Sequence, residues 1–201
     1  MPVAVWLGYI LARQKAQKRV LLEFFLALPL VLPPVAVGYG LLLLFGVNGV
    51  VGKILHEHLG IRISFTFYGA VIAAAIVSLP LATRSVRIAI EALPREFEDA
   101  AISLGATSRS VFWRVILPMA RPGVLSGAVL AFIRSVGEFG ATMVLAGNIE
   151  GETRTLALSL WTALQQPEGE NTAMRLLLLT TLLSVAALLI SEHLSQSSKE
   201  P

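Results

Sequence analysis

EDAAISLGATSRSVFWRVILP, residues 98–118, is a polar segment that carries arginines, a glycine near its middle and a Leu-Pro pair at its end. It lies between two stretches that are apolar enough to cross a membrane. Connections between membrane segments tend to be short unless they have a role of their own. The length and charge of this one favour a docking surface.

The composition argues against an ordinary soluble protein. Of the 201 residues, 55% are hydrophobic and 14% are charged, and the mean hydropathy is +0.74. Soluble domains carry about 25% charged residues. The net charge of +3 is spread between apolar runs and forms no basic patch, which argues against a nucleic-acid partner. Because the chain has no cysteine, a disulfide framework and a thiolate metal site are both excluded.

Four apolar runs reach the length of about 20 residues that a helix needs to span a bilayer. They cover residues 20–46, 64–83, 122–146 and 172–191. A fifth stretch, 2–12, is too short to span alone and is interpreted as a partial first span. It does not fit a signal peptide, because its positive charges follow the apolar residues. We therefore predict an all-α polytopic membrane protein with a single transmembrane domain over residues 1–201.

The loop charges predict the orientation of these spans. Segments 13–19 and 84–121 are rich in arginine and lysine, whereas 147–171 carries four glutamates and one arginine. Positively charged loops stay on the cytoplasmic side of a membrane. Segment 84–121 is thus expected inside the cell and the acidic loop 147–171 outside.

The first half of the cytoplasmic segment has the spacing of a helix. The helix of span 64–83 is expected to continue into 84–93, and Pro94 suits the first turn of a new helix. Apolar side chains then recur at helical spacing at Phe97, Ala100, Ala101 and Leu104. This helix would have one apolar face and one solvated face.

The second half of the segment predicts a turn and a second, shorter helix. Gly105 can adopt the left-handed conformation that ends a helix. Thr107 or Ser108 can then cap a helix that contains Val111, Phe112 and Val115. From spacing alone, this helix–turn–helix fits a docking surface and a solvated helical linker equally well.

The segment also resembles the cytoplasmic EAA loop of ABC-importer permeases. The pattern of that loop is Glu-Ala-Ala, three residues, Gly, nine residues and Ile-x-Leu-Pro. Here it runs Asp99-Ala100-Ala101, Gly105 and Val115-Ile116-Leu117-Pro118 with the spacing intact. Asp replaces Glu and Val replaces Ile, and Glu98 directly before the motif can supply the longer carboxylate.

That resemblance implies a type I ABC-importer permease fold in which loop 88–121 provides coupling helices that fit a groove on a separate ATPase. The coupling residues that it implies are Glu98, Asp99, Ala100, Ala101, Gly105, Leu117 and Pro118. The chain itself has no G-x-x-x-x-G-K-[ST] phosphate loop. We therefore expect it to hold no catalytic residue and no cofactor, with ATP and Mg²⁺ bound by the partner ATPase.

Two charged residues fall near the middle of run 122–146. Arg134 and Glu138 are spaced i and i+4, so they can form a pair. Charges at this depth usually face a bundle interior or a water-filled path. Together with Gly137 and Gly140, they are candidates for a translocation pathway or gate. The alternative is a structural ion pair at the interface between two copies, and the sequence favours neither.

Two further patterns have less specific meanings. Pro29, Pro33 and Pro34 in run 20–46 predict a broken helix, because proline removes backbone donors and kinks a helix. His56 and His58 form an H-x-H pattern that lacks further ligands, so we interpret them as surface histidines and predict no metal site.

Segments 29–40 (PLVLPPVAVGYG) and 137–155 (GEFGATMVLAGNIEGETRT) resemble those of molybdate/tungstate-type ABC permeases. This resemblance implies a multi-pass homodimer in the bacterial or archaeal inner membrane, two ATPase subunits and an external oxyanion-binding protein. It also implies alternating access driven by ATP. Sulfate/thiosulfate permeases share the architecture, but GEFGAT and GETRT favour molybdate. Relatives begin with a complete membrane helix, of which this sequence carries only 2–12, so we expect a late start or a truncation.

Two functions of other classes compete with this one. A secondary transporter or channel would need no ATPase, and the helix–turn–helix of 94–118 argues against it. A membrane protein for assembly or anchoring would transport nothing. Mid-membrane Arg134 and Glu138 and the proline-broken span argue against that function.

Overall fold

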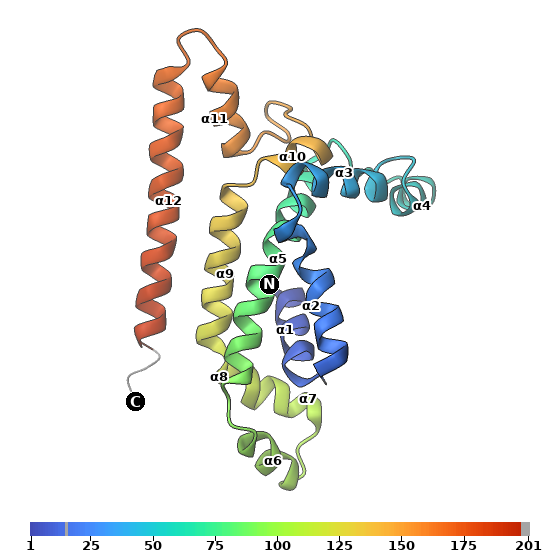
Figure 1. Cartoon of the computed structure of the whole chain (residues 1–201), viewed down its shortest axis with the longest axis vertical. Coiled ribbons are helices and arrows are strands. Elements are labelled where there is room, and N and C mark those ends of the chain that lie inside the picture. The colour runs from blue at the N-terminus through green and yellow to red at the C-terminus, as the bar shows by residue number, and fades with distance from the viewer. Residues whose placement is uncertain (15, 198–201) are drawn as a thin grey trace. The chain divides into compact units, whose positions relative to one another are not determined.

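The computed structural model describes residues 1–14 and 16–197, with side chains for 1–14 and 17–192. The described chain contains helices and no strand, which confirms the all-α prediction (Figure 1). It divides into two compact units. Unit 1 consists of Met1–Leu26, Leu79–Ala131 and the residues from Leu188 onward, and unit 2 consists of Ala27–Ser78 and Phe132–Ala187.

Unit 1 contains helix α1 and the helices that surround the polar segment. Its elements are α1 (Pro2–Arg13), the start of α2 (Ala16–Val31), the end of α5 (Phe67–Glu91), α6 (Glu96–Ser103), α7 (Ser108–Val111), a π-helical turn (Phe112–Ile116), α8 (Leu117–Met119) and most of α9 (Arg121–Val136). Its core joins Ala12 of α1 to Val86 and Ile90 of α5 and to Val111 and Ile116 of the polar segment. The polar segment is therefore packed onto membrane helices and is no free linker.

Glycines let the helices of unit 1 approach closely. A Cβ atom added at Gly8 of α1 would lie 2.8 Å from Cγ1 of Val86. One added at Gly123 of α9 would lie 2.1 Å from Cβ of Ala89. Small residues at helix contacts are the usual means by which membrane helices pack backbone against backbone.

Unit 2 is built around the contact of two short helices. Its elements are the end of α2, α3 (Pro34–Phe45), α4 (Val50–Leu59), the start of α5, the end of α9, α10 (Gly140–Leu145), α11 (Leu156–Leu164) and most of α12 (Glu170–Ser197). Helix α3 lies on α10. Its core contains Val37 and Leu41 of α3, Ala73 and Val77 of α5, and Ala141 and Leu145 of α10.

Within the described residues, two helices are long and apolar enough to cross a membrane, Phe67–Glu91 and Glu170–Glu192. Two bent pairs raise the number to four if each pair is one span. They are Gln17–Val31 with Pro34–Phe45, bent by 113°, and Ser108–Met119 with Arg121–Val136, bent by 71°. The first bend confirms the break predicted from the prolines of run 20–46. Run 122–146 is also divided, because α9 ends at Val136 and α10 begins at Gly140.

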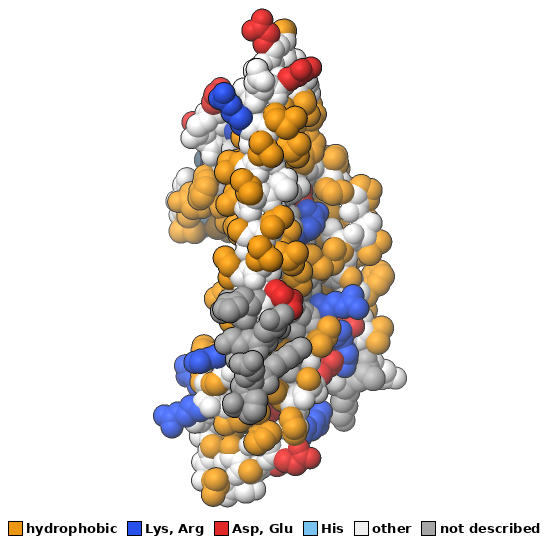
Figure 2. Space-filling model, turned by 90° about the vertical axis from the view of Figure 1, so that its left-hand side faces the viewer, with side chains coloured by type: hydrophobic (Ala, Val, Ile, Leu, Met, Phe, Trp, Pro, Cys, Tyr) orange, Lys and Arg blue, Asp and Glu red, His pale blue; other side chains and the backbone are white. Residues whose placement is uncertain are grey.

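Helix α12 presents a long apolar face. Figure 2 shows hydrophobic side chains along this helix, and the exposed ones include Leu178, Leu182 and Val185. Only 6% of its apolar window is buried within the chain. Such a surface is expected to face lipid or another subunit, because soluble proteins rarely expose large contiguous apolar patches.

Candidate functional site

The polar segment forms the predicted helix–turn–helix. Helix α6 ends at Ser103, and Gly105 has a φ of +87°. The N–H of Ala106 donates to the carbonyl of Ala101 at 3.0 Å and that of Gly105 to Ile102 at 2.9 Å. This is the Schellman pattern with glycine at its left-handed position. The predicted left-handed turn at Gly105 is thereby confirmed.

The N-cap of α7 agrees with the prediction from the sequence, whereas the start of α6 does not. Thr107 caps α7, since its hydroxyl accepts a hydrogen bond from the N–H of Ser110 at 3.3 Å. Pro94 was expected in the first turn of α6, but the helix begins at Glu96 and Arg95 is its N-cap. The first turn holds Glu96, Glu98 and Asp99 instead, and these charges complement the positive N-terminal end of the helix dipole.

Helix α6 turns the neighbouring carboxylates of Glu98 and Asp99 to different surroundings. Glu98 is shielded and forms an ion pair with Arg13 of α1, and the two side chains are 17% and 18% exposed. Asp99 and Ala100 are exposed, whereas Ala101 packs against the core of unit 1. The candidate docking residues therefore divide, with Asp99 and Ala100 outward and Glu98 and Ala101 inward.

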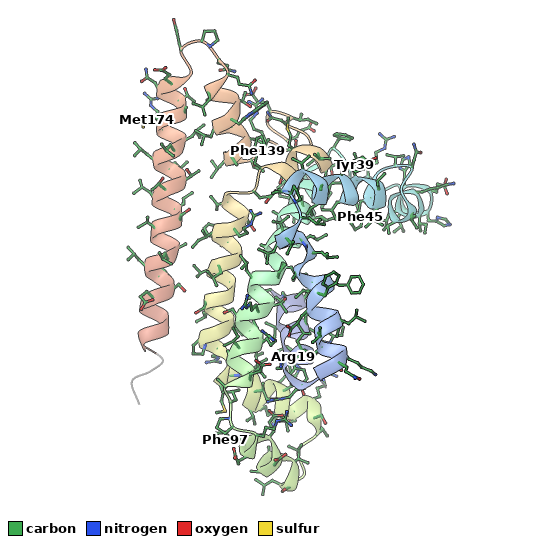
Figure 3. All side chains as sticks on the ribbon, in the orientation of Figure 1. Arg19, Tyr39, Phe45, Phe97, Phe139 and Met174 are labelled. Atoms are coloured by element: carbon green, nitrogen blue, oxygen red, sulfur yellow. The ribbon has the colours of Figure 1, made fainter. Side chains whose placement is uncertain are left out.

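An apolar surface accompanies Asp99 on the outside of α6. Phe97, which Figure 3 labels, is half exposed, and so is Ile102. Leu104 is 89% exposed. Phe97, Asp99, Ala100, Ile102 and the C-cap residue Leu104 are exposed around the helix, and we call them together the outer face of α6.

The second arm contains a feature that the sequence did not predict. Residues Phe112–Ile116 form a π-helical turn, and Leu117 and Pro118 follow in α8, both half buried. Pro118 has no N–H and cannot donate to the carbonyl four residues earlier. A proline inside an otherwise helical stretch was the only local signal for an irregular turn here.

Arg13 is a partly buried cation beside this segment. Burial lowers its pKa, and the positive charge of Arg95 lowers it further. A guanidinium stays protonated in proteins nonetheless. The guanidinium in the pair with Glu98 therefore keeps its charge at physiological pH.

Unit 2 brings Arg134 and Glu138 together, as their spacing predicted. Nη1 of Arg134 lies 2.8 Å from Oε2 of Glu138, which is 1% exposed. Oε2 makes this ion pair without an aligned hydrogen bond, whereas Oε1 accepts one from the N–H of Ala141 at 2.9 Å. Gly137 lies in the break between α9 and α10. At Gly140 an added Cβ would lie 2.8 Å from Cβ of Pro34, so this glycine serves close packing.

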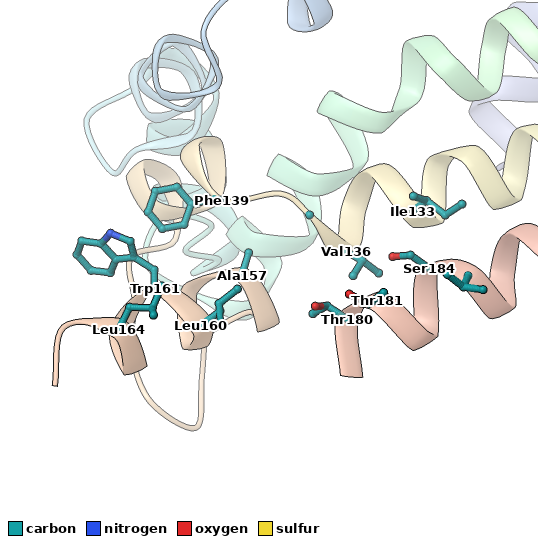
Figure 4. Close-up of a pocket in the computed structure, with 12 residues that line it drawn as sticks. Ile133, Val136, Phe139, Ala157, Leu160, Trp161, Leu164, Thr180, Thr181 and Ser184 are labelled. Atoms are coloured by element: carbon teal, nitrogen blue, oxygen red, sulfur yellow. The ribbon is translucent and has the colours of Figure 1, made fainter. Parts of the chain in front are cut away.

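A cavity of about 610 Å³ lies beside this break, between the end of α9, α11 and α12 (Figure 4). Apolar side chains such as Val136, Phe139 and Trp161 line it, together with the hydroxyls of Thr180, Thr181 and Ser184. Of the four pathway candidates only Gly137 contributes to the lining, and no lining residue is charged. Its lining suits an apolar occupant better than an oxyanion.

The loop predicted to lie outside is held by its own side chains. Arg154 donates from Nε to Oδ1 of Asn148 at 2.9 Å and lies 3.3 Å from Glu150. The buried hydroxyl of Thr153 accepts from the N–H of Ile149 at 3.0 Å. Helix α11 begins directly after this turn, at Leu156. The GETRT motif thus shapes a fixed turn before α11.

Comparison with known proteins adds a family to this geometry. The family described as "Binding-protein-dependent transport system inner membrane component" matches residues 4–199. The molybdenum transport system permease protein ModB of Escherichia coli (strain K12) is 44% identical over 200 residues, which cover 100% of this chain and 87% of that protein. The sulfate transport system permease protein CysT of Salmonella typhimurium is 38% identical over 160 residues, 80% of this chain and 57% of that protein.

A solved structure of the MetNI methionine ABC transporter, described as inward facing, has a TM-score of 0.71 to this chain at 17% sequence identity. The match covers 99% of this chain and 85% of the chain in that structure. The likeness confirms the predicted ABC-importer permease fold. The chain is a multi-pass transport subunit of the inner membrane, and it belongs to the family of binding-protein-dependent transport system inner membrane components.

Proposed function

We propose that this chain is the permease subunit of an ATP-driven importer for the molybdate or tungstate oxyanion. The observation that carries the proposal is the 44% identity to a molybdenum permease over the whole chain. The sulfate permease is less identical, at 38%, and matches 80% of the chain. The GEFGAT motif (137–142) covers the break before α10 and the start of that helix. The GETRT motif (151–155) covers the turn before α11.

The proposed assembly is a homodimer of this chain with two ATPase subunits inside the cell and an oxyanion-binding protein outside. The outer face of α6 supports an ATPase partner, because it combines a carboxylate with exposed apolar side chains. ATP and Mg²⁺ would be held by that partner. The exposed apolar face of α12 is available to lipid or to the second copy.

The proposed mechanism is alternating access. ATP binding closes the paired ATPases and draws the two α6 helices together, which turns the membrane helices to face outward. Hydrolysis then returns them to the inward-facing state. Asp99, Ala100 and the Gly105 turn would carry the contact, with Leu117 and Pro118 at the return to the membrane.

The direct test is uptake into vesicles that contain the chain, the ATPase and the binding protein. We expect molybdate uptake that requires ATP and that tungstate inhibits more strongly than sulfate does. Preferential uptake of sulfate would overturn the substrate assignment. Uptake that persists without the ATPase would instead indicate a secondary transporter or channel.

Arg134 and Glu138 remain the candidates for a pathway or gate element. The guanidinium keeps 27% exposure while the carboxylate is buried, so only the cation is open to an approaching oxyanion. Removing one partner of a buried pair costs about 3–5 kcal/mol, because the other charge stays buried and unpaired. A single neutral substitution would therefore confuse misfolding with loss of transport.

The double variant Arg134→Gln/Glu138→Gln removes both charges and is the better test of this role. We expect it to assemble but to lose molybdate uptake by about tenfold or more, comparable with the loss of one charge-assisted contact. The matched control is Lys53→Gln/Glu57→Gln, which removes an exposed pair of the same i and i+4 spacing. Normal uptake by the Arg134→Gln/Glu138→Gln variant would show that this ion pair has a structural role and no role in the pathway.

A further inference from the structure

Helix α1 contacts both arms of the helix–turn–helix with its last two turns. Arg13 pairs with Glu98 of α6. Tyr9 meets Phe112 of the π-helical turn edge to face, with ring centroids 4.9 Å apart. Ala12, between them, is buried in the core of unit 1 with Val111. Helix α1, whose Arg13 precedes Glu98 by 85 residues in sequence, thus contacts the helix–turn–helix on the side of Glu98.

The ion pair is the polar contact that ties α6 to α1, beside the packing of Ala101 and of the flanking Leu93 and Ala106 against the core of unit 1. None of the residues of α6 is fully buried, so apolar packing fixes this helix weakly. Ala101 is the member of α6 that packs against the core, and its side chain is a single methyl group. The Arg13–Glu98 pair is shielded on both sides, and Nε of Arg13 is buried as well. Shielded charges are screened less than surface charges, so salt weakens this contact less than an exposed ion pair, and removal of either partner leaves the other shielded and unpaired.

Helix α1 is in turn fixed to α5. Gly8 lies so close to Val86 that a Cβ atom there would collide with its side chain at 2.8 Å. Among the described residues, α5 is one of two helices long and apolar enough to cross a membrane by themselves. A continuous path of contacts therefore leads from α6 through Arg13 and α1 to α5.

We propose that Arg13 is a positioning residue of the transport cycle, which ties α6 to α1 through Glu98 so that both helices move as one body. Glu98 then acts within the chain, and Asp99 is the carboxylate of the Asp99-Ala100-Ala101 motif that is left for the ATPase. This inference rests on the proposed function, because it assumes that an ATPase moves α6. It extends that function to α1, which the EAA resemblance does not include.

The charge pairs of Arg19 provide a matched control. Arg19 lies 2.6 Å from Glu91 of α5 and 2.7 Å from Glu23 of its own helix, and neither partner belongs to α6. An Arg19→Gln variant removes a cation of the same kind from the same unit. It leaves the link between α1 and α6 in place.

The test measures molybdate uptake and ATP hydrolysis together in vesicles with the complete complex. Arg13→Gln and Glu98→Gln are each expected to lower the uptake per ATP hydrolysed by about fivefold or more, the low end of measured couplings between sites. The charge-swapped double variant Arg13→Glu/Glu98→Arg should recover most of that ratio. Arg19→Gln should keep the ratio of the unmodified protein.

Three results would overturn the inference. They are an unchanged ratio in both single variants, a parallel fall of uptake and hydrolysis with the amount of assembled complex, and no recovery in the charge-swapped variant. The Asp99→Arg variant distinguishes a failure of this inference from a failure of the proposed function. If it loses the ATPase while the Arg13 variants couple normally, the function stands and the link fails. If the unmodified complex shows no ATP-dependent molybdate uptake, the proposed function itself fails.

A distance measurement tests the shared movement directly. Because the chain has no cysteine, spin labels can be placed on Val3→Cys of α1 and Ser103→Cys of α6 alone. We expect their separation to stay the same when ATP is added to the complex, and to change or broaden when Arg13→Gln is introduced. A separation that shifts with ATP in the otherwise unmodified protein would contradict one-body movement.

Discussion

Gly38→Leu is expected to prevent unit 2 from folding. Helix α3 crosses α10 at this glycine, and an added Cβ atom would lie 2.7 Å from Cα of Ala141 and 2.8 Å from its carbonyl oxygen. Those atoms are backbone of a fully buried residue and cannot rotate away. The helices must separate, which opens the core around Leu41 and Leu145 and costs about 3 kcal/mol or more. The yield of monodisperse protein in detergent and its thermal midpoint measure the loss.

The same helix offers the control. Gly40 lies two residues further along α3, and a Cβ atom there would meet nothing within 4 Å. Gly40→Leu makes the same change in helix propensity and in hydrophobicity without the collision. It should keep the yield of the unmodified protein. Equal yields for the two variants would show that α3 does not rest on α10 at Gly38.

Local signals were sufficient where a single residue decides the backbone. Gly105 predicted its left-handed turn and Thr107 its cap, because both depend on neighbours within a few residues. The prolines near residue 33 predicted the break between α2 and α3 for the same reason. The continuation of α5 beyond residue 83, through Glu91, also followed from uninterrupted helical sequence.

Features that depend on distant contacts did not follow from the sequence. The break between α9 and α10 falls inside an apolar run, and it exists where Gly140 packs against Pro34 of another helix. Nothing near Glu98 indicated that its partner would be Arg13, because long-range pairing needs the tertiary fold. The π-helical turn at Phe112–Ile116 was not predicted either, since its composition is that of an ordinary amphipathic helix and Pro118 alone does not specify the type of irregularity.

The sequence also did not predict which of the docking residues point outward and which point inward. Spacing placed Glu98 and Asp99 side by side on one helix, and the resemblance to the EAA loop gave both a role in docking. Adjacent residues on a helix point about 100° apart, since a turn takes 3.6 residues. Which of the two faces the partner depends on where α1 lies, and only the fold supplies that.

Gly105→Val is expected to uncouple ATP hydrolysis from molybdate uptake while the membrane helices still insert. With a φ of +87°, this position strains any β-branched residue, at a cost of about 1–3 kcal/mol. An added Cβ atom would meet nothing within 4 Å, so the change acts through the backbone alone. Relief of the strain breaks the two Schellman hydrogen bonds and reorients α6 against α7. Uptake per ATP hydrolysed in vesicles with all components measures the effect, with insertion checked by extraction from the membrane.

Gly60→Val controls for strain as such. Gly60 has a φ of +66° and equally open surroundings, but it is the C-cap of α4. It should suffer a similar loss of stability and keep its uptake per ATP. Gly105→Asn should retain much of the coupling, because asparagine tolerates the left-handed conformation better than valine does. Coupled transport that persists in Gly105→Val would mean that the turn has no part in transmission and that the helix–turn–helix is a linker.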